Sequence, residues 1–263
     1  MSFLEHGLNA AAVMIGPAMQ NESVYRTYLR LRGAREPSLP KWNFMNRALK
    51  SHGEVAAAVA EAERIGLFRY YMDVEKTWDS LSALSYLLGT TDRGAKILDA
   101  GSSLYSVILP WLSLYGYRQL VGMNLSFPRE MAHGPISYVK GDITKTKFGH
   151  GEFGAITCLS VIEHLPIIPS FLREMSRLLE AGGSLVLSTD YWPQSLGSGE
   201  KRAYNTSFNV FDSRGIENLI RTAGLYGLEV TGEPDLRVGA PLVKWHGMRF
   251  TFVVLAFKKV IQD

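Results

Sequence analysis

Polar residues follow a series of short apolar runs in the second half of the sequence. The first run leads into Asp99-Ala100-Gly101-Ser102-Ser103. Later runs end in Asn124-Leu125-Ser126, Gly141-Asp142-Ile143, Ser160-Val161-Ile162-Glu163-His164 and Asp190-Tyr191-Trp192. A glycine turn lets a ligand approach the backbone, an amide or acid can bind ribose hydroxyls, and a carboxylate can accept from an exocyclic amine. Together these groups predict a site for a nucleoside-type ligand.

The apolar runs have the length and composition of β-strands. The expected strands are Lys96–Ala100, Gln119–Asn124, Ile136–Val139, Gly154–Ser160, Ser184–Thr189, Leu228–Thr231 and Phe250–Phe257. Helical segments such as Ser213–Ala223 alternate with them, which predicts a parallel sheet with helices on both faces. The last two strands have no helical pattern between them, so we expect an antiparallel edge pair. Ligands bind at the carboxyl ends of the strands in such a sheet, and the polar residues therefore share one rim.

The N-terminal third has a different pattern. Glu54–Phe68 is rich in strong helix formers, and Trp78–Leu88 has apolar residues at a helical period. We therefore expect residues 1–92 to form a helical extension or lid and residues 93–263 to form the domain that contains the sheet.

The ordered strand ends resemble those of the class I, Rossmann-like S-adenosylmethionine-dependent methyltransferases, in particular the type 11 enzymes that act on small molecules. The matching segments are Lys96–Gly101, Val121–Ser126, Lys140–Ile143, Phe153–Leu165 and the Gly-Gly turn in Leu178–Leu185. Their order and spacing are more specific than any one of them, and the resemblance covers about residues 92–260.

This resemblance implies a seven-stranded, mostly parallel sheet of order 3-2-1-4-5-7-6 whose last strand is antiparallel. It also implies S-adenosylmethionine as cofactor and S-adenosylhomocysteine as product. The cofactor-binding residues that it implies are Asp99, Gly101, Ser102, Ser103, Asn124, Leu125, Asp142, Ile143 and Ser160. For Asp99 and Asp142, the alternative interpretation is an aspartate that only orders its turn.

Two positions depart from the family pattern. Ser103 stands where a second glycine is common, so the loop must follow a different path. Asn124 replaces the usual acid on the ribose, and an amide lacks the charge-assisted strength of a carboxylate. We therefore expect weaker cofactor binding or a compensating contact elsewhere. A catalytically inactive protein that binds a cofactor or a partner is the first alternative.

Methyl transfer to oxygen also needs a base. The candidates are His164, Asp190 and His246, and the candidate substrate-lining residues are Tyr71, Trp78, Glu163, Tyr191, Trp192 and Tyr204. Plain packing explains the aromatic residues equally well. Some relatives hold a metal with Glu-x-x-Glu-His, but Ser160 occupies the first position here, so we predict no metal.

Composition limits the remaining function classes. The net charge of +3 does not by itself indicate a nucleic-acid partner. A basic stretch from Arg26 to Lys50 is most simply a solvated surface, although an RNA-modifying methyltransferase is a further alternative. The single cysteine, Cys158, excludes an internal disulfide and is expected in the core. Without Gly-x-Gly-x-x-Gly after the first strand, a nicotinamide dehydrogenase is not supported.

No apolar run is long enough to span a membrane, and the first residues match a signal peptide poorly. We therefore expect a cytoplasmic methyltransferase with a small-molecule acceptor, such as a sugar, metabolite or natural product. A homodimer is left open.

Overall fold

The computed structural model describes residues 23–24, 26–27, 37–67, 74–197, 202–203 and 206–260. Its helices are α3 (His52–Arg64), α4 (Lys76–Thr90), α5 (Ile108–Leu114), α6 (Ile168–Leu178) and α7 (Ser213–Leu225), with a 3-10 helix at Ile162–His164. Its longer strands are β2 (Lys96–Ala100), β3 (Gln119–Asn124), β5 (Ile136–Lys140), β6 (Phe153–Leu159), β7 (Leu179–Tyr191) and β12 (Met248–Lys259). The short strands are β1 (Arg47–Ala48), β4 (Met131–His133), β8 (Arg202–Ala203), β9 (Thr206–Ser207), β10 (Leu228–Val230) and β11 (Val243–Trp245).

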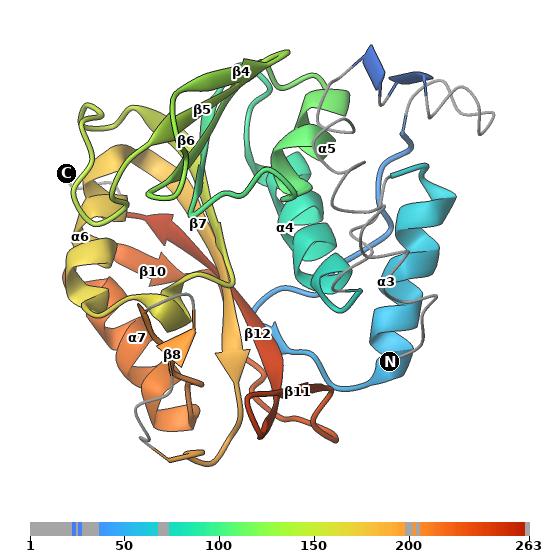
Figure 1. The fold of residues 1–263 in the computed structure, drawn as a ribbon, viewed down its shortest axis with the longest axis vertical. Coiled ribbons are helices and arrows are strands. Elements are labelled where there is room, and N and C mark those ends of the chain that lie inside the picture. The colour runs from blue at the N-terminus through green and yellow to red at the C-terminus, as the bar shows by residue number, and fades with distance from the viewer. Residues whose placement is uncertain are drawn as a thin grey trace.

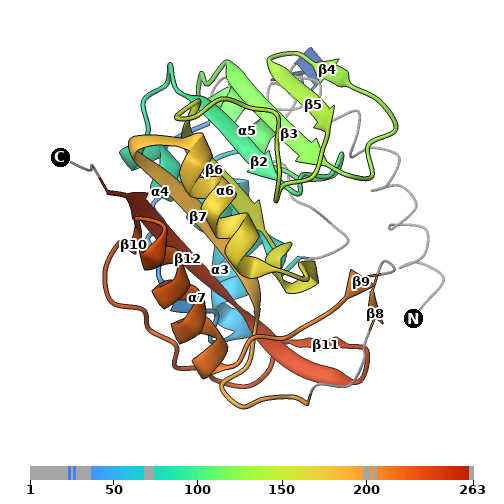
Figure 2. The same ribbon diagram turned by 90° about the vertical axis from the view of Figure 1, so that its left-hand side faces the viewer.

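The main sheet has ten strands among the described residues. Its order is β1-β12-β7-β6-β2-β3-β5-β4, and β10 and β11 also pair with β12. Within it, the seven predicted strands lie in the predicted order, β5-β3-β2-β6-β7-β12-β10, and β12 is antiparallel to both neighbours. The predicted count of seven was too low, because β1, β4 and β11 are only two or three residues long and have no recognisable periodicity. Figure 2 shows β4 beside β5 at one end of the sheet and β10 and β11 beside β12 at the other.

Strand β7 begins earlier than predicted. The segment Ala181-Gly182-Gly183, expected as a turn, lies inside β7. Gly182 has a φ of +75°, and the pairing of β6 with β7 shifts register between Phe153 and Ala155. An irregularity in the β6–β7 pairing therefore occupies the place of the expected turn, and the positive φ of Gly182 is one that glycine adopts readily.

Helices cover both faces of the sheet, as predicted (Figure 1). Neighbouring residues of each central strand point to opposite faces, so Ile97 packs toward α3, α4 and α5 while Leu98 packs toward α6 and α7. Each face thus has its own apolar core, and both sides of the parallel strands are buried. Cys158 lies fully buried in the second core, as expected.

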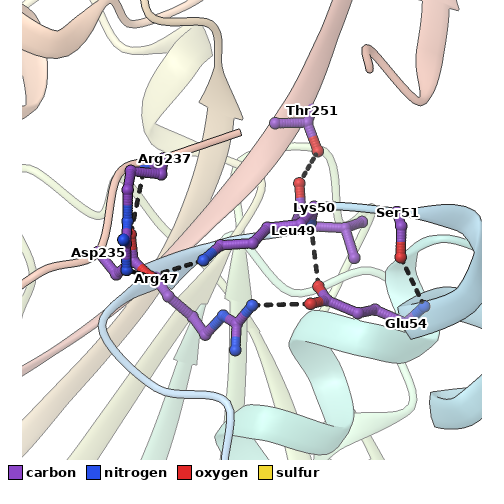
Figure 3. A network of polar contacts seen from close by, with 8 residues as sticks. All are labelled: Arg47, Leu49, Lys50, Ser51, Glu54, Asp235, Arg237 and Thr251. Atoms are coloured by element: carbon purple, nitrogen blue, oxygen red, sulfur yellow. Dashed lines mark hydrogen bonds and ion pairs between the residues drawn. The ribbon is translucent and has the colours of Figure 1, made fainter. Parts of the chain in front are cut away.

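The segment that precedes α3 is part of the sheet. Strand β1 pairs with Val253 and Val254 of β12, and the hydroxyl of Thr251 donates to the carbonyl of Leu49 at 2.7 Å. An ion-pair network fixes the same edge (Figure 3). In this network Arg47 pairs with Glu54 at 2.7 Å, Lys50 pairs with Asp235 at 2.6 Å, and Arg237 pairs with Asp235 at 2.8 Å.

The described part of the N-terminal region packs directly on the sheet. The side chains of α3 and α4 lie in one apolar core with strands β2, β6, β7 and β12, so the described residues before position 92 share a core with the sheet. Arg47 and Lys50, two members of the basic stretch, are engaged in ion pairs. No described helix has the length and apolar character needed to cross a membrane.

Candidate active site

The turn after β2 depends on the absence of a side chain at Gly101. This residue has a φ of +87°, which L-residues rarely adopt. A Cβ atom there would lie 2.5 Å from Cγ2 of Val161, which follows β6. The backbone N–H of Gly101 donates to the carbonyl of Met123 in β3 at 2.9 Å. The turn is therefore packed between the exits of β3 and β6, and only glycine fits there.

Asp99 lies buried beneath this turn. The hydroxyl of Thr157 in β6 donates to Oδ1 of Asp99 at 2.7 Å. Burial raises the pKa of the Asp99 carboxyl from 3.8 to about 6, although the hydrogen bond from Thr157 acts in the opposite direction. Asp99 thus links β2 to β6 directly beneath the Gly101 turn.

This raised pKa predicts a pH dependence of stability. In the unfolded chain Asp99 ionises near its ordinary pKa of 3.8, whereas in the folded chain it keeps its proton up to about pH 6. Its contribution to stability is therefore complete below pH 3.8 and is lost as the pH rises to about 6. Asp99→Asn is expected to remove a decline of about 3 kcal/mol across this window. Urea unfolding at a series of pH values measures it, and an unchanged pH slope in the variant would contradict it.

Asn124, at the end of β3, contacts the same turn. Its Nδ2 donates to the carbonyls of Gly101 at 3.2 Å and Ser102 at 2.8 Å. Its Oδ1 accepts from the backbone N–H of Ser126 at 2.9 Å and from the Ser126 hydroxyl at 2.8 Å. Ser103 does not adopt a positive φ, and its N–H donates to the Ser106 hydroxyl at 3.2 Å. The predicted departures from the family pattern thus have internal partners.

Asp142 lies at the exit of β5 and is exposed. Its Oδ1 accepts from the backbone N–H and the hydroxyl of Thr144, at 2.8 and 2.7 Å, which is the geometry of an aspartate that orders a turn. Ile143 beside it is buried. Leu125 and Tyr105 are large apolar side chains that are 63% and 51% exposed on the neighbouring loops. Exposed apolar side chains beside an acid suit an adenine, which has an apolar face and a polar edge.

A hydrogen-bonded chain crosses from α4 to the exits of β6 and β7. The ammonium of Lys76 donates to the Ser160 hydroxyl, whose oxygen lies 3.5 Å from that of Ser188. The Ser188 hydroxyl in turn donates to Oδ2 of Asp79 at 2.5 Å. Ser160 has a φ of +53°, an uncommon value for serine. The first turn of α4 is therefore tied to the rim of the sheet.

Glu163 and His164 lie beside this chain in the 3-10 helix that follows β6. Glu163 is buried, and the hydroxyl of Thr189 donates to it at 3.1 Å. Burial raises the pKa of Glu163 to about 7, while the charge of Lys76 acts to lower it. Burial and the same Lys76 charge lower the pKa of His164 below its ordinary 6.5. The His164 imidazole is consequently neutral at pH 7 and able to accept a proton.

Aromatic rings connect His164 to the β11–β12 hairpin. The ring of Phe208 lies 5.4 Å from that of His164 and 4.6 Å from that of Trp245. His246 is exposed in the turn of this hairpin, with a φ of +45°. The two predicted histidines therefore lie on separate elements with Phe208 and Trp245 between them.

The other predicted site residues differ in how deeply they are buried. Asp190 is buried opposite Phe252 of β12, so both side chains point to one face of the sheet, and the Lys76 ammonium lies 3.5 Å from the centre of the Phe252 ring. Tyr191 is fully buried and its hydroxyl donates to the carbonyl of Leu236 at 3.1 Å. Trp78 is also fully buried, which favours the packing interpretation, and Trp192 is half-buried. Tyr71 and Tyr204 lie outside the described residues.

Sequence reasoning missed several residues of this site, namely Lys76, Asp79, Phe208 and Phe252. A lysine at the start of a helix is usually solvated, so its pattern carried no signal. Across the part of the chain that the structure describes, no three His, Cys, Asp or Glu side chains are grouped as metal ligands would be.

A family model for a methyltransferase domain matches residues 69–230, which is more than half of the 263-residue chain. The chain belongs to the class I S-adenosylmethionine-dependent methyltransferases. As a member of the methyltransferase-domain family it is an enzyme with S-adenosylmethionine as methyl donor. The residues present fit this cofactor, since the turn at Gly101 has no room for a Cβ and the loops that follow β2, β3 and β5 carry exposed Tyr105, Leu125 and Asp142, two apolar groups and an acid.

Several solved structures resemble this methyltransferase, and three of them illustrate the range. One is a methyltransferase from Methanosarcina mazei, with a TM-score of 0.50 and 14% identity over 67% of this chain and 98% of that one. Another is the 1,6-didemethyltoxoflavin-N1-methyltransferase of Burkholderia thailandensis with bound 1,6-didemethyltoxoflavin and S-adenosylhomocysteine, with a TM-score of 0.51 and 17% identity over 81% and 92%. The third is the [4+2]-cyclase SpnF, with a TM-score of 0.51 and 11% identity over 74% and 85%. Identities this low show the fold alone, and a fold can serve several chemistries.

Among curated proteins, the ubiquinone biosynthesis O-methyltransferase of Xanthomonas oryzae pv. oryzae is 46% identical over 39 residues. This match covers 15% of the methyltransferase described here and 16% of that enzyme, far less than two thirds of its length.

Proposed function

We propose that this methyltransferase methylates an oxygen or nitrogen of a small molecule, bound at the exits of β6 and β7. The observation that carries the proposal is the neutral, half-buried His164 beside buried Glu163, at the rim where the cofactor turn of Gly101 also packs. Bound S-adenosylmethionine supplies an electrophilic methyl group. The chain must supply the acceptor's position, exclude water and remove a proton.

His164 is the base in this proposal. A hydroxyl or protonated amine of the acceptor gives its proton to the imidazole, which is neutral at pH 7 because burial and Lys76 disfavour its charged form. Glu163, next to His164, and Asp190, in β7, are both buried at the exits of β6 and β7. His246, in an exposed hairpin turn, is the less suitable base because water surrounds it.

The aromatic rings of Phe208, Trp245 and Phe252 form the apolar part of the proposed acceptor site. Phe208 contacts His164 and Trp245, and Phe252 contacts Lys76. Such rings suit a planar or apolar acceptor. We also propose that residues before position 92 form one wall of this site, since α4 supplies Lys76.

Calorimetry followed by an acceptor screen tests the function. S-adenosylmethionine and S-adenosylhomocysteine are titrated into the full chain, and methyl-labelled S-adenosylmethionine is then incubated with phenols, sugars, heterocyclic amines and RNA. Binding with transfer to a small molecule supports the proposal. No binding by a folded sample would refute it, binding without transfer would favour an inactive cofactor-binding protein, and transfer to RNA would favour the RNA-modifying alternative.

A further inference from the structure

Asn124 occupies the position from which the family's acid binds the ribose, yet its amide is already saturated. An amide has two N–H donors and two acceptor lone pairs. Here both donors go to backbone carbonyls of the β2 turn, those of Gly101 and Ser102. Both lone pairs accept from Ser126, one from its N–H and one from its hydroxyl.

The surrounding groups determine the orientation of the amide. The oxygen faces two donors and the nitrogen faces two carbonyls, so the opposite orientation would bring like groups together at both ends. For the same reason a carboxylate at this position could keep the contacts to Ser126 but would repel the carbonyls of Gly101 and Ser102.

We propose that Asn124 is a positioning residue that fastens the β2 turn to the β3 turn and leaves recognition of the ribose hydroxyls to other groups. The asparagine is then a requirement of this loop rather than a weakened copy of the family's acid. Ser103 belongs to the same arrangement, because its N–H and hydroxyl both contact the Ser106 hydroxyl at 3.2 Å and the loop thereby closes on itself. The proposal rests on the use of S-adenosylmethionine at this turn.

The test compares Asn124→Asp and Asn124→Ala with wild type by calorimetry with S-adenosylhomocysteine. If Asn124 fastens the turn, both variants bind more weakly, by roughly tenfold or more, and the aspartate is no better than the alanine. If Asn124 instead binds the ribose as the acid does, Asn124→Asp binds at least as tightly as wild type, which would overturn the proposal. Asn218→Asp, the same change on an exposed turn of α7, is the matched control and is expected to bind as wild type does.

Two further measurements separate this role from a direct contact. Analogues of S-adenosylhomocysteine that lack the 2′- or 3′-hydroxyl should lose the same factor of affinity in wild type and in Asn124→Ala, whereas a smaller loss in the variant would show a direct contact. Hydrogen exchange of the cofactor-free protein should be faster at residues 101–103 in both Asn124 variants. Unchanged exchange there would also overturn the proposal, and this readout stands even if the chain binds no cofactor.

Discussion

Replacing His164 with alanine is expected to lower the rate of methyl transfer by about 10²–10⁴-fold, the usual contribution of a general base. Two of the three candidate bases are histidines, and His164 is the one whose imidazole is partly buried, at the exit of β6 and next to the Phe208 ring. Burial and the charge of Lys76 lower its pKa, so the neutral form is ready to take the acceptor's proton at pH 7. The single-turnover rate with the acceptor found by screening is the measurement.

The matched control is His246→Ala, which removes the same side chain from an exposed hairpin turn. It should keep the rate within about threefold of wild type, and a collapse in this variant with a normal rate in His164→Ala would move the base to the hairpin. Affinity for S-adenosylhomocysteine should be unchanged in both, which separates a loss of the base from a loss of cofactor binding.

The lowered pKa of His164 determines how the rate of methyl transfer is expected to depend on pH. Because the folded-state pKa of His164 is below 6.5, the base is in its active, neutral form above that value and is lost only as the pH falls further. Removing the Lys76 charge with Lys76→Met should shift the acidic limb of the profile toward higher pH, since a nearby cation disfavours the imidazolium. Burial raises the pKa of Glu163 to about 7, and the Lys76 charge also acts on this carboxyl. The ionisation of Glu163 therefore contributes to the same pH profile.

The strand ends could be read from the sequence because parallel strands buried on both faces are nearly continuous apolar runs. Strands β2 and β3 have the predicted bounds for this reason. The short strands β1 and β11 could not be read this way, since a segment of two or three residues is held by its partner and not by its own pattern. β1 in particular depends on β12, about 200 residues later in the chain.

For the candidate site, too, only part could be predicted from the sequence. The positions of Asp99, Gly101 and Asn124 follow from local spacing, and all three meet at one turn. What local spacing could not provide is the state of each side chain. The amide of Asn124 is saturated by its neighbours, and Lys76 reaches Ser160, 84 residues away in the sequence. Such contacts arise only when α4 packs on the sheet, and they decide which groups carry charge at the rim.

Gly101→Ala is expected to reduce affinity for S-adenosylhomocysteine by roughly 100-fold and to destabilise the fold. Two separate effects oppose a methyl group there. The φ of +87° is strained for any L-residue, at a cost of about 1–3 kcal/mol. The added Cβ would also lie 2.5 and 2.6 Å from the methyl carbons of Val161, so the turn must move away from β6. Cofactor binding must then return the turn to its original position. A free-energy cost of about 2–3 kcal/mol for this movement corresponds to the expected loss of affinity.

Gly116→Ala separates these effects, because Gly116 has a similar φ of +93° but nothing within 4 Å of its virtual Cβ. It should lose stability by the strain alone and bind S-adenosylhomocysteine as wild type does. In the double variant Gly101→Ala/Val161→Ala the two shortest contacts are removed, while the strain and a 3.0 Å contact with Cβ of residue 161 remain, so part of the affinity should return. Equal stability losses in Gly101→Ala and Gly116→Ala, with normal cofactor affinity in both, would show that contact with Val161 does not shape the turn. Recovery of affinity in the double variant would instead establish that the exit of β6 holds the cofactor turn in place, and that the two halves of the site are mechanically coupled through this one contact.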